Sequence, residues 1–496
     1  GAGGSVGGDE GGGPFVYGWN SMPRKIFNDY STGLSDDTRT IQHPKKIEAA
    51  QAGLGERTSA KGTVAYVLPI TTCYGEGHNM LKEGAIDYNV HPASANQPKD
   101  EESFRDFAVM LRAMIHANSH RNPASKSVYD YEMHAIIHPR AKKCRLGSDG
   151  EDGDGDVVDR SLVLQNLGYK VSVKYSPISK GSIEGSDYLR EYMTKREGKQ
   201  IVDLIRLYAY ELERYDAVAL VDYDTLILGP VDEAVDLIAD SNKRDGDGNT
   251  DNSNSGIDAV FSWEYLPSLT NPRVRSSAIN LSFFLLRPSK STFDKLVSGY
   301  KNAPFSETRG WGSKMIGRGS FAGWMTTQGF LTYYYDEVEN AAKVEMNRCA
   351  FGNTDENYDA DKSILITSGG KVECGGADAD SAGSLANNNL CSECSKFKLE
   401  DVSVADLSYC RAPWECNGGG VDGDENDAAE FSSTKLSSGL CRQFQKMWFA
   451  GRLQMQDVHP QLQKGNGQLC IDGEYQPMAL LKPSAGVAYD EAPLME

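Results

Sequence analysis

Apolar segments rich in β-branched residues alternate with segments of helical period, and this alternation constrains the fold more than any other feature. The extended segments lie at 64–70 (VAYVLPI), 131–138, 169–175 and 217–221. Helices are predicted between them, where apolar residues recur at i, i+3 and i+4, at 102–117, 157–167 and 200–213. Further strands are predicted at 259–263 and 283–286, and further helices at 290–300 and 328–335. Regular alternation of this kind predicts an α/β fold with a mostly parallel central sheet.

The overall charge argues against two classes of partner. The 496 residues carry 51 basic and 70 acidic side chains, which give a formal net charge of −19. Neither nucleic acid nor an anionic membrane surface is therefore expected as the main partner. No apolar run approaches the ~20 residues that a bilayer-spanning helix needs, so no membrane span is predicted within this chain.

Ten cysteines are unevenly distributed. Cys73 and Cys144 stand apart, whereas the other eight fall between 349 and 470. A zinc site at Cys391-x-x-Cys394 would need a second close pair of ligands, and the spacing from Cys410 onward does not supply one. Zinc and free thiols remain alternatives, but disulfides are favoured, which places the protein in an oxidising compartment, either the secretory lumen (Golgi) or the outside of the cell.

One predicted strand ends abruptly in two acidic residues. In YDAVALVDYDTLILGPVDE (215–233), an apolar run leads into Asp222 and Asp224. Ligands of open parallel sheets bind beyond the carboxyl ends of the strands, and residues i and i+2 of an extended chain point the same way. Hard oxygen ligands suit Mg²⁺ or Mn²⁺, and such an ion can bridge the phosphates of a nucleotide diphosphate. The alternative interpretation is a turn with two solvated acids.

Four blocks together resemble one known family. They are RLYAYELERYDAVALVDYDTLIL (206–228), INLSFFLLRPSKSTFDKLV (279–297), TTQGFLTYYY (326–335) and DLSYCRAPWEC (406–416). In this order they resemble the glycogenin-like retaining glycosyltransferases, glycosyltransferase family eight, over about 65–415. The resemblance implies a GT-A fold, a Rossmann-like nucleotide-diphospho-sugar transferase domain that binds a UDP-sugar and Mn²⁺ (or Mg²⁺) and transfers a hexose with retention of configuration.

The resemblance also implies roles for individual residues. Asp222 and Asp224 match the metal-binding pair, and Asp222 lies near the ribose. Arg206 stands where the family has a lysine that contacts the diphosphate, and arginine preserves such a contact. Tyr223, between the two acids, belongs to the expected nucleotide-binding set. Asn280 matches an asparagine that hydrogen-bonds the donor sugar.

The remaining matches include departures from the family pattern. Gln328 is retained, and it joins Thr327 and Asn280 in the expected catalytic set, although Thr327 replaces an aspartate that binds sugar hydroxyls. Asp406 stands in the place of a histidine that is the third metal ligand, so three carboxylates are predicted to converge on one cation. Ala412 replaces a lysine that pairs with the diphosphate. Cys410, beside this predicted metal site, is expected to form a disulfide.

Three regions are expected: a Gly-rich leader and N-terminal arm (1–61), a GT-A domain (62–416) and a disulfide-containing C-terminal extension (417–496). Two hypotheses follow. The first is an active UDP-sugar-dependent hexosyltransferase acting on a carbohydrate or glycoprotein acceptor. The second is a catalytically weak or inactive relative that serves as a binding or cell-surface structural component.

Overall fold

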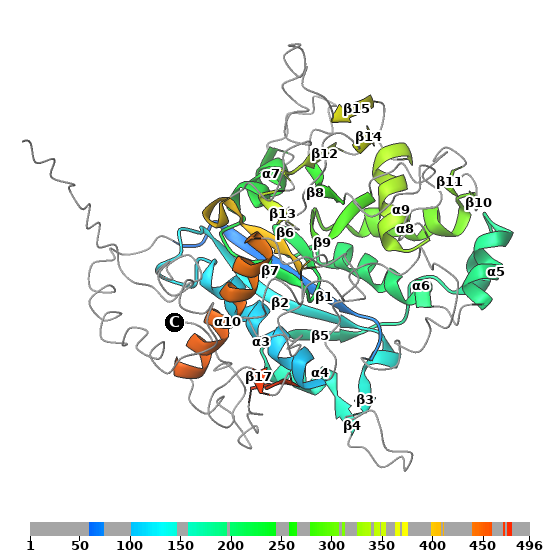
Figure 1. The fold of residues 1–496 in the computed structure, drawn as a ribbon. Helices are drawn as coiled ribbons and strands as arrows, with labels where there is room; N and C mark the ends of the chain where they lie inside the picture. The colour runs from blue at the N-terminus through cyan, green and yellow to red at the C-terminus, as the bar shows by residue number, and fades with distance from the viewer. Residues whose placement is uncertain are drawn as a thin grey trace, which may run out of the picture.

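A seven-stranded sheet forms the centre of the molecule (Figure 1). The computed structural model describes residues 59–73, 101–145, 157–195, 199–244, 257–264, 278–306, 310–312, 325–338, 342–347, 349–353, 363–367, 370–374, 398–407, 410, 439–458, 470–471 and 474–478. In spatial order the strands are β12 (Ala342–Glu345), β8 (Ile257–Glu264), β9 (Ala278–Leu286), β6 (Ala217–Val221), β1 (Gly62–Ile70), β2 (Tyr129–Ile137) and β5 (Lys170–Val173). The predicted strands are thus all present, with β9 extending further toward its N-terminus than expected.

The sheet is mostly parallel. Strands β5, β2, β1 and β6 run in one direction, and β12 is parallel to β8. Only β9, among these seven, runs antiparallel to its neighbours β6 and β8. The prediction of an α/β fold with a mostly parallel central sheet is confirmed.

Helices cover both faces of the sheet. Their bounds are α3 (Glu101–Ala117), α4 (Arg160–Asn166), α5 (Asp187–Lys195), α6 (Lys199–Asp203), α7 (Asp232–Arg244), α8 (Lys290–Asn302), α9 (Thr327–Tyr333) and α10 (Gly439–Val458). Alternate residues of β1 enter opposite cores: Val64 and Tyr66 pack in the core with α3, α7 and α10, whereas Ala65 and Val67 pack in the core with α8 and α9. An extended apolar run without polar alternation is explained by this burial on both faces.

A second, three-stranded sheet lies beyond the end of β6. Its strands are β13 (Phe351–Asn353), β16 (Val404–Asp406) and β7 (Thr225–Ile227), with β16 in the middle. Strand β7 begins only four residues after β6 ends. The turn between them carries the two acidic residues that the sequence singled out, and it joins the two sheets.

The helix predicted over 157–167 is wrong at its start. Val157–Asp159 forms strand β4, which pairs with β3 (Lys143–Arg145), and α4 begins at Arg160. The side chain of Asp159 accepts a hydrogen bond from the backbone N–H of Ser161 at 3.0 Å, so it caps the helix and defines its first turn. Gly168 follows the helix with φ 81°, as expected of a glycine after a helix C-terminus.

The helix predicted over 200–213 is interrupted. Helix α6 ends at Asp203, and residues Leu204–Glu211 form a 3₁₀ helix. The buried side chains of this segment include Leu204, Ile205 and Leu207, which pack in the α8–α9 core. Periodicity alone did not distinguish the tighter helix.

The C-terminal region contains a long helix that the sequence analysis missed. Helix α10 buries Phe444, Met447 and Trp448 in the same core as α3. The Cys- and Gly-rich segments around it hid its period. Residues 1–58 of the predicted leader and N-terminal arm (1–61) lie outside the described residues, as do Cys391 and Cys394.

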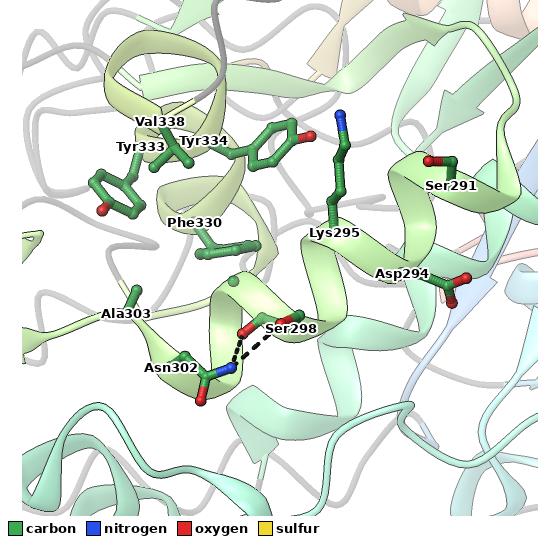
Figure 2. Close-up of a pocket in the computed structure, with 11 residues that line it drawn as sticks. Ser291, Asp294, Lys295, Ser298, Asn302, Ala303, Phe330, Tyr333, Tyr334 and Val338 are labelled. Carbon is green, nitrogen blue, oxygen red and sulfur yellow. Dashed lines mark hydrogen bonds between the residues drawn. The ribbon is translucent and has the colours of Figure 1, made fainter.

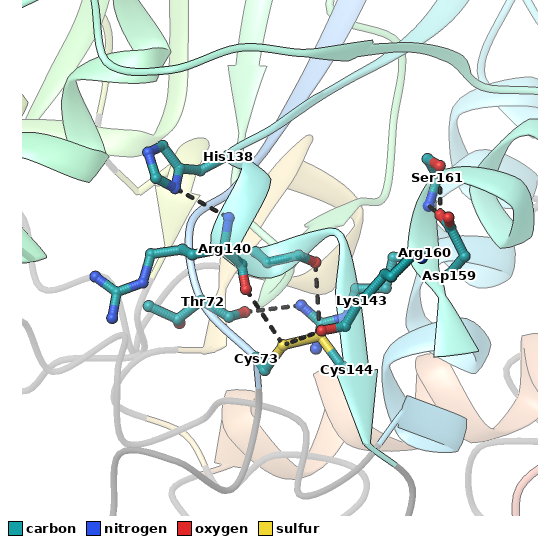
Figure 3. The surroundings of a disulfide bond; sticks show 10 residues. Thr72, Cys73, His138, Arg140, Lys143, Cys144, Asp159, Arg160 and Ser161 are labelled. Carbon is teal, nitrogen blue, oxygen red and sulfur yellow. Dashed lines mark hydrogen bonds between the residues drawn. A yellow bond between two sulfur atoms is a disulfide. The ribbon is translucent and has the colours of Figure 1, made fainter. Parts of the chain in front are cut away.

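Two disulfides are described. Cys410 pairs with Cys441 of α10, with 5.3 Å between Cα atoms, which confirms the prediction for Cys410. Cys73 pairs with Cys144, with 5.6 Å between Cα atoms, although they are 71 residues apart in the sequence (Figure 3). The parallel pairing of β1 with β2 explains the second bond, because it brings the ends of both strands, and the cysteines that follow them, side by side. Within the described ranges no cysteine is free, which is typical of proteins in oxidising compartments.

No helix in the described part of the chain is long and apolar enough to cross a membrane.

Candidate functional site

The predicted acidic pair lies at the carboxyl end of β6. Asp222 and Asp224 are both buried, and Asp224 is 0% exposed. The backbone N–H of Asp222 donates to the carbonyl of Ser282 at 3.2 Å, and the hydroxyl of Thr225 donates to the same carbonyl at 2.7 Å. The turn that holds both acids is therefore attached to the neighbouring strand β9.

Asp406 arrives at the same place from a distant part of the sequence. Strand β16 runs antiparallel to β7, with Asp406 opposite Thr225. The backbone N–H of Leu407 donates to the carbonyl of Asp224 at 2.9 Å. The second sheet thus brings the third predicted carboxylate next to the acidic turn.

Strand β9 supplies two polar groups that contact Asp406. The hydroxyl of Ser282 donates to a carboxylate oxygen of Asp406 at 2.7 Å, and the amide of Asn280 donates to the same oxygen at 3.4 Å. The side-chain oxygen of Asn280 accepts from the backbone N–H of Ser282 at 2.7 Å. Asn280, predicted to contact a sugar, is in this structure hydrogen-bonded to other protein groups.

Arg206 connects the acidic turn to helix α6. Its Nη1 donates to Asp222 and its Nε donates to Asp203, each at 2.7 Å. Burial would lower the pKa of Arg206, but the charges of Asp222 and Asp203 outweigh this and raise it. Arg206 is therefore a fixed cation held between two carboxylates, and its contact with a diphosphate stays a prediction.

The two predicted residues at the start of α9 lie beside this ion pair. The backbone N–H of Thr327 donates to the second carboxylate oxygen of Asp203 at 3.1 Å, and its hydroxyl donates to the backbone carbonyl of Asp203 at 3.0 Å. The amide of Gln328 donates to the backbone carbonyl of Ile279 at 3.0 Å, next to Asn280. Burial would raise the pKa of Asp203, but Arg206 and the hydrogen bonds from Arg206 and Thr327 lower it, so this acid is a carboxylate at neutral pH.

Tyr223 lies between the two acids of the turn and is partly buried. Its ring packs edge-on against Phe107 of α3, with 6.1 Å between ring centroids. The position of Ala412, where the sequence departs from the family pattern, lies outside the described residues.

The oxygen ligands available here suit a hard divalent cation, but in this structure the side chains do not converge on one point. Asp222, Asp224 and Asp406 are buried carboxylates at the end of a parallel strand, and burying several negative charges together is costly without a compensating cation. Over the described ranges, however, no group of three or more His, Cys, Asp or Glu side chains is arranged to hold a metal. Shared coordination by all three carboxylates therefore stays a prediction that requires side-chain movement.

The hollow drawn in Figure 2 is separate from these residues. It lies between α8 and the end of α9, and residues that line it include Lys295, Asn302 and Tyr334. None of the predicted site residues lines it. The candidate site is therefore defined by its hydrogen-bond network and buried charges, and not by this hollow.

Two residues at the site have roles that the sequence analysis did not foresee. Asp203 binds Arg206, and the i, i+3 spacing of an acid and a base on a helix was the signal that could have revealed it. Ser282 contacts Asp222, Thr225 and Asp406. Only the pairing of β9 with β6 shows this second role, because no local pattern marks a serine in an apolar strand.

Similarity to known proteins is found among solved structures. No family model matches the chain, and no curated protein matches its sequence. Among solved structures, an active-site mutant of LgtC is similar with a TM-score of 0.32 and 9% identity, over 73% of this chain and 92% of that one. The galactosyltransferase LgtC in complex with donor and acceptor sugar analogs is similar with a TM-score of 0.30 and 9% identity, over 78% of this chain and 95% of that one. TM-scores of this size are too low to assign an activity or a substrate to this chain.

Proposed function

We propose that this protein is a retaining glycosyltransferase of GT-A fold that transfers a hexose from a UDP-sugar to a carbohydrate or glycoprotein acceptor in the secretory lumen, such as the Golgi, or outside the cell. One observation carries the proposal: three of the four blocks, which are far apart in the sequence, meet at the carboxyl end of one parallel strand. They contribute Arg206, the acidic turn at Asp222 and Asp224, Asn280 and Asp406. Ligand sites of open α/β sheets lie at this end of the strands.

The charged groups suit a nucleotide-diphosphate ligand. Arg206 presents a planar guanidinium, of which Nε and Nη1 bind Asp203 and Asp222, and its remaining N–H groups can donate to phosphate oxygens. Asp222 and Asp224 would hold Mn²⁺ or Mg²⁺, with Asp406 as a third ligand. When bound, that ion would neutralise charge on the departing diphosphate.

Asn280 and Gln328 fix the geometry of the surface where a sugar would lie. Asn280 orients Asp406 and the backbone of β9. Gln328 ties the first turn of α9 to β9 through the carbonyl of Ile279. Both amides are positioned without a ligand, so little reorganisation is required at this wall of the site when a sugar binds.

The direct test is the release of UDP by the purified chain. It would be incubated with Mn²⁺ and, one at a time, UDP-glucose, UDP-galactose and UDP-N-acetylglucosamine. Release of UDP with one sugar, abolished in Asp222→Asn, would support the proposal. UDP binding by the wild-type protein without release or transfer would favour the second hypothesis below.

A catalytically inactive relative that acts as a binding or cell-surface structural component is the second candidate. Thr327 favours it, because this side chain is fully buried, donates to the backbone of Asp203 and has no negative charge. An oxocarbenium-like transition state gains stabilisation from a nearby carboxylate, which Thr327 itself cannot supply.

A further inference from the structure

The carboxylate of Asp203 lies where α6 ends and α9 begins. One of its oxygens accepts from Nε of Arg206 at 2.7 Å, and the other accepts from the backbone N–H of Thr327 at 3.1 Å. An ionised carboxylate offers about four lone-pair positions. These two hydrogen bonds therefore leave acceptor capacity on both oxygens of Asp203.

Asp203 is also more accessible than the carboxylates around it. Its side chain is 21% exposed, compared with 7% for Asp222 and 14% for Arg206. Asp224 and Asp406 are almost completely buried. A ligand that enters beside Arg206 would therefore meet the partly exposed carboxylate of Asp203.

A fixed cation next to a partly exposed carboxylate suits a ligand of mixed character. The guanidinium of Arg206 favours phosphate oxygens, whereas the carboxylate of Asp203 can only accept hydrogen bonds, as hydroxyl groups donate them. A sugar attached to a diphosphate carries both kinds of group side by side. Thr327, which contacts Asp203, occupies the position where the resemblance leads one to expect a carboxylate.

We propose that Asp203 accepts hydrogen bonds from hydroxyl groups of the donor sugar and thereby supplies, from α6, the carboxylate that position 327 of α9 lacks. The inference rests on the proposed function, because it assigns a residue to the sugar part of the same ligand. It makes Thr327 a positioning residue, since the N–H and hydroxyl of Thr327 hold the end of α6 and the carboxylate of Asp203 in place.

The test compares Asp203→Asn with a matched control. The asparagine has nearly the same size and can still accept from the N–H of Thr327, but it has no charge. Asp216→Asn is the control, because Asp216 is also partly exposed and also accepts a backbone hydrogen bond, from the N–H of Thr63 at 2.8 Å, at the opposite end of β6. Thermal unfolding would first establish that both variants fold.

Calorimetry with Mn²⁺ would then measure Kd for UDP and for the best-binding UDP-sugar of the panel. The expected result for Asp203→Asn is at least tenfold weaker binding of the UDP-sugar and less than threefold weaker binding of UDP. Asp216→Asn should change neither value. The exchange variant, Asp203→Thr with Thr327→Asp, should recover most of the lost affinity for the UDP-sugar. It moves the carboxylate from α6 to α9 and keeps it in the contact between residues 203 and 327.

Two outcomes would overturn the inference while leaving the proposed function intact. Equal weakening of UDP and the UDP-sugar would show that Asp203 acts only by orienting Arg206, and unchanged binding of both would show that it contacts no ligand. Wild-type protein that binds neither UDP nor any UDP-sugar would instead refute the proposed function, and the inference with it.

Discussion

Replacement of Arg206 with methionine should destabilise the folded protein at neutral pH. The guanidinium forms two charge-assisted hydrogen bonds of 2.7 Å, one to Asp203 and one to Asp222. Methionine keeps much of the apolar stem but removes both hydrogen bonds and the positive charge. Two carboxylates would then lie close together in a largely buried region without their cation.

The expected cost follows from these contacts. A hydrogen bond to a charged group contributes ~1.5–3 kcal/mol, so the loss of two gives ~3–6 kcal/mol. The side chain of Asp203 is 21% exposed and can turn toward solvent, which places the estimate near the lower limit. We therefore expect Arg206→Met to lower the free energy of unfolding by about 3 kcal/mol at pH 7, within the range for breaking a buried ion pair.

The cost should depend on pH in a defined direction. Burial raises the pKa of Asp203, but Arg206 and the hydrogen bonds from Arg206 and Thr327 hold it below its ordinary value. A group whose folded pKa is lowered contributes stability above its unfolded pKa, about 3.9 for aspartate, and loses that contribution as the pH falls through the folded pKa. The difference between wild type and Arg206→Met should therefore be full at pH 7 and should shrink below about pH 4.

Urea denaturation, monitored by tryptophan fluorescence, would measure the difference in the free energy of unfolding between wild type and Arg206→Met at pH 7 and at about pH 3.5. Arg190→Met is a suitable control, because Arg190 pairs with Asp187 at the same i, i+3 spacing but on the surface, where such a pair contributes ~0–1 kcal/mol. The reasoning is refuted if Arg206→Met costs no more than the control, or if its cost does not decrease in acid.

Three further predictions concern the metal, a disulfide and acid stability. Asp224→Asn should weaken Mn²⁺-dependent UDP binding at least tenfold, about 1.4 kcal/mol, in calorimetry; unchanged binding would remove Asp224 from the ligand set. Joint replacement of Cys73 and Cys144 by serine opens a loop of 71 residues. In the chain-entropy description it should lower the free energy of unfolding by about 4 kcal/mol. A loss below about 1 kcal/mol, measured by urea denaturation, would contradict a native disulfide. Burial, assisted by the charge of Arg214, lowers the pKa of His134 to about 4. The stability that neutral His134 contributes is therefore present above its unfolded pKa, and lowering the pH from 7 to 5 should reduce the free energy of unfolding by about 2 kcal/mol. His134→Gln should lose that much less on acidification in the same assay, and an equal loss would exclude His134 as the cause.

The pattern of apolar residues identified most of the strands and helices, because the main strands are continuous apolar runs. Residues 64–68 alternate between two cores, so each of them is apolar and a buried parallel strand is the simplest interpretation. Period was less informative where local hydrogen bonds or packing decided the conformation. Asp159 caps α4, which begins three residues later than the apolar pattern suggested, and Leu204–Glu211, which packs in the same core as α8 and α9, forms a 3₁₀ helix.

The chemical identity of the candidate site was available from the sequence, whereas its contacts were not. An apolar run that ends in Asp222 and Asp224 predicts carboxylates at a strand end, because side chains two apart on an extended chain share a face. The positions of Asp406 beside Thr225 and of Asp203 against Thr327 depend on strand pairing and helix packing between segments far apart in the chain. The same is true of Cys73 and Cys144, which become neighbours only because β1 and β2 run parallel and end together. Local patterns determined which groups this chain possesses, and only long-range pairing in the tertiary structure decided which of them meet.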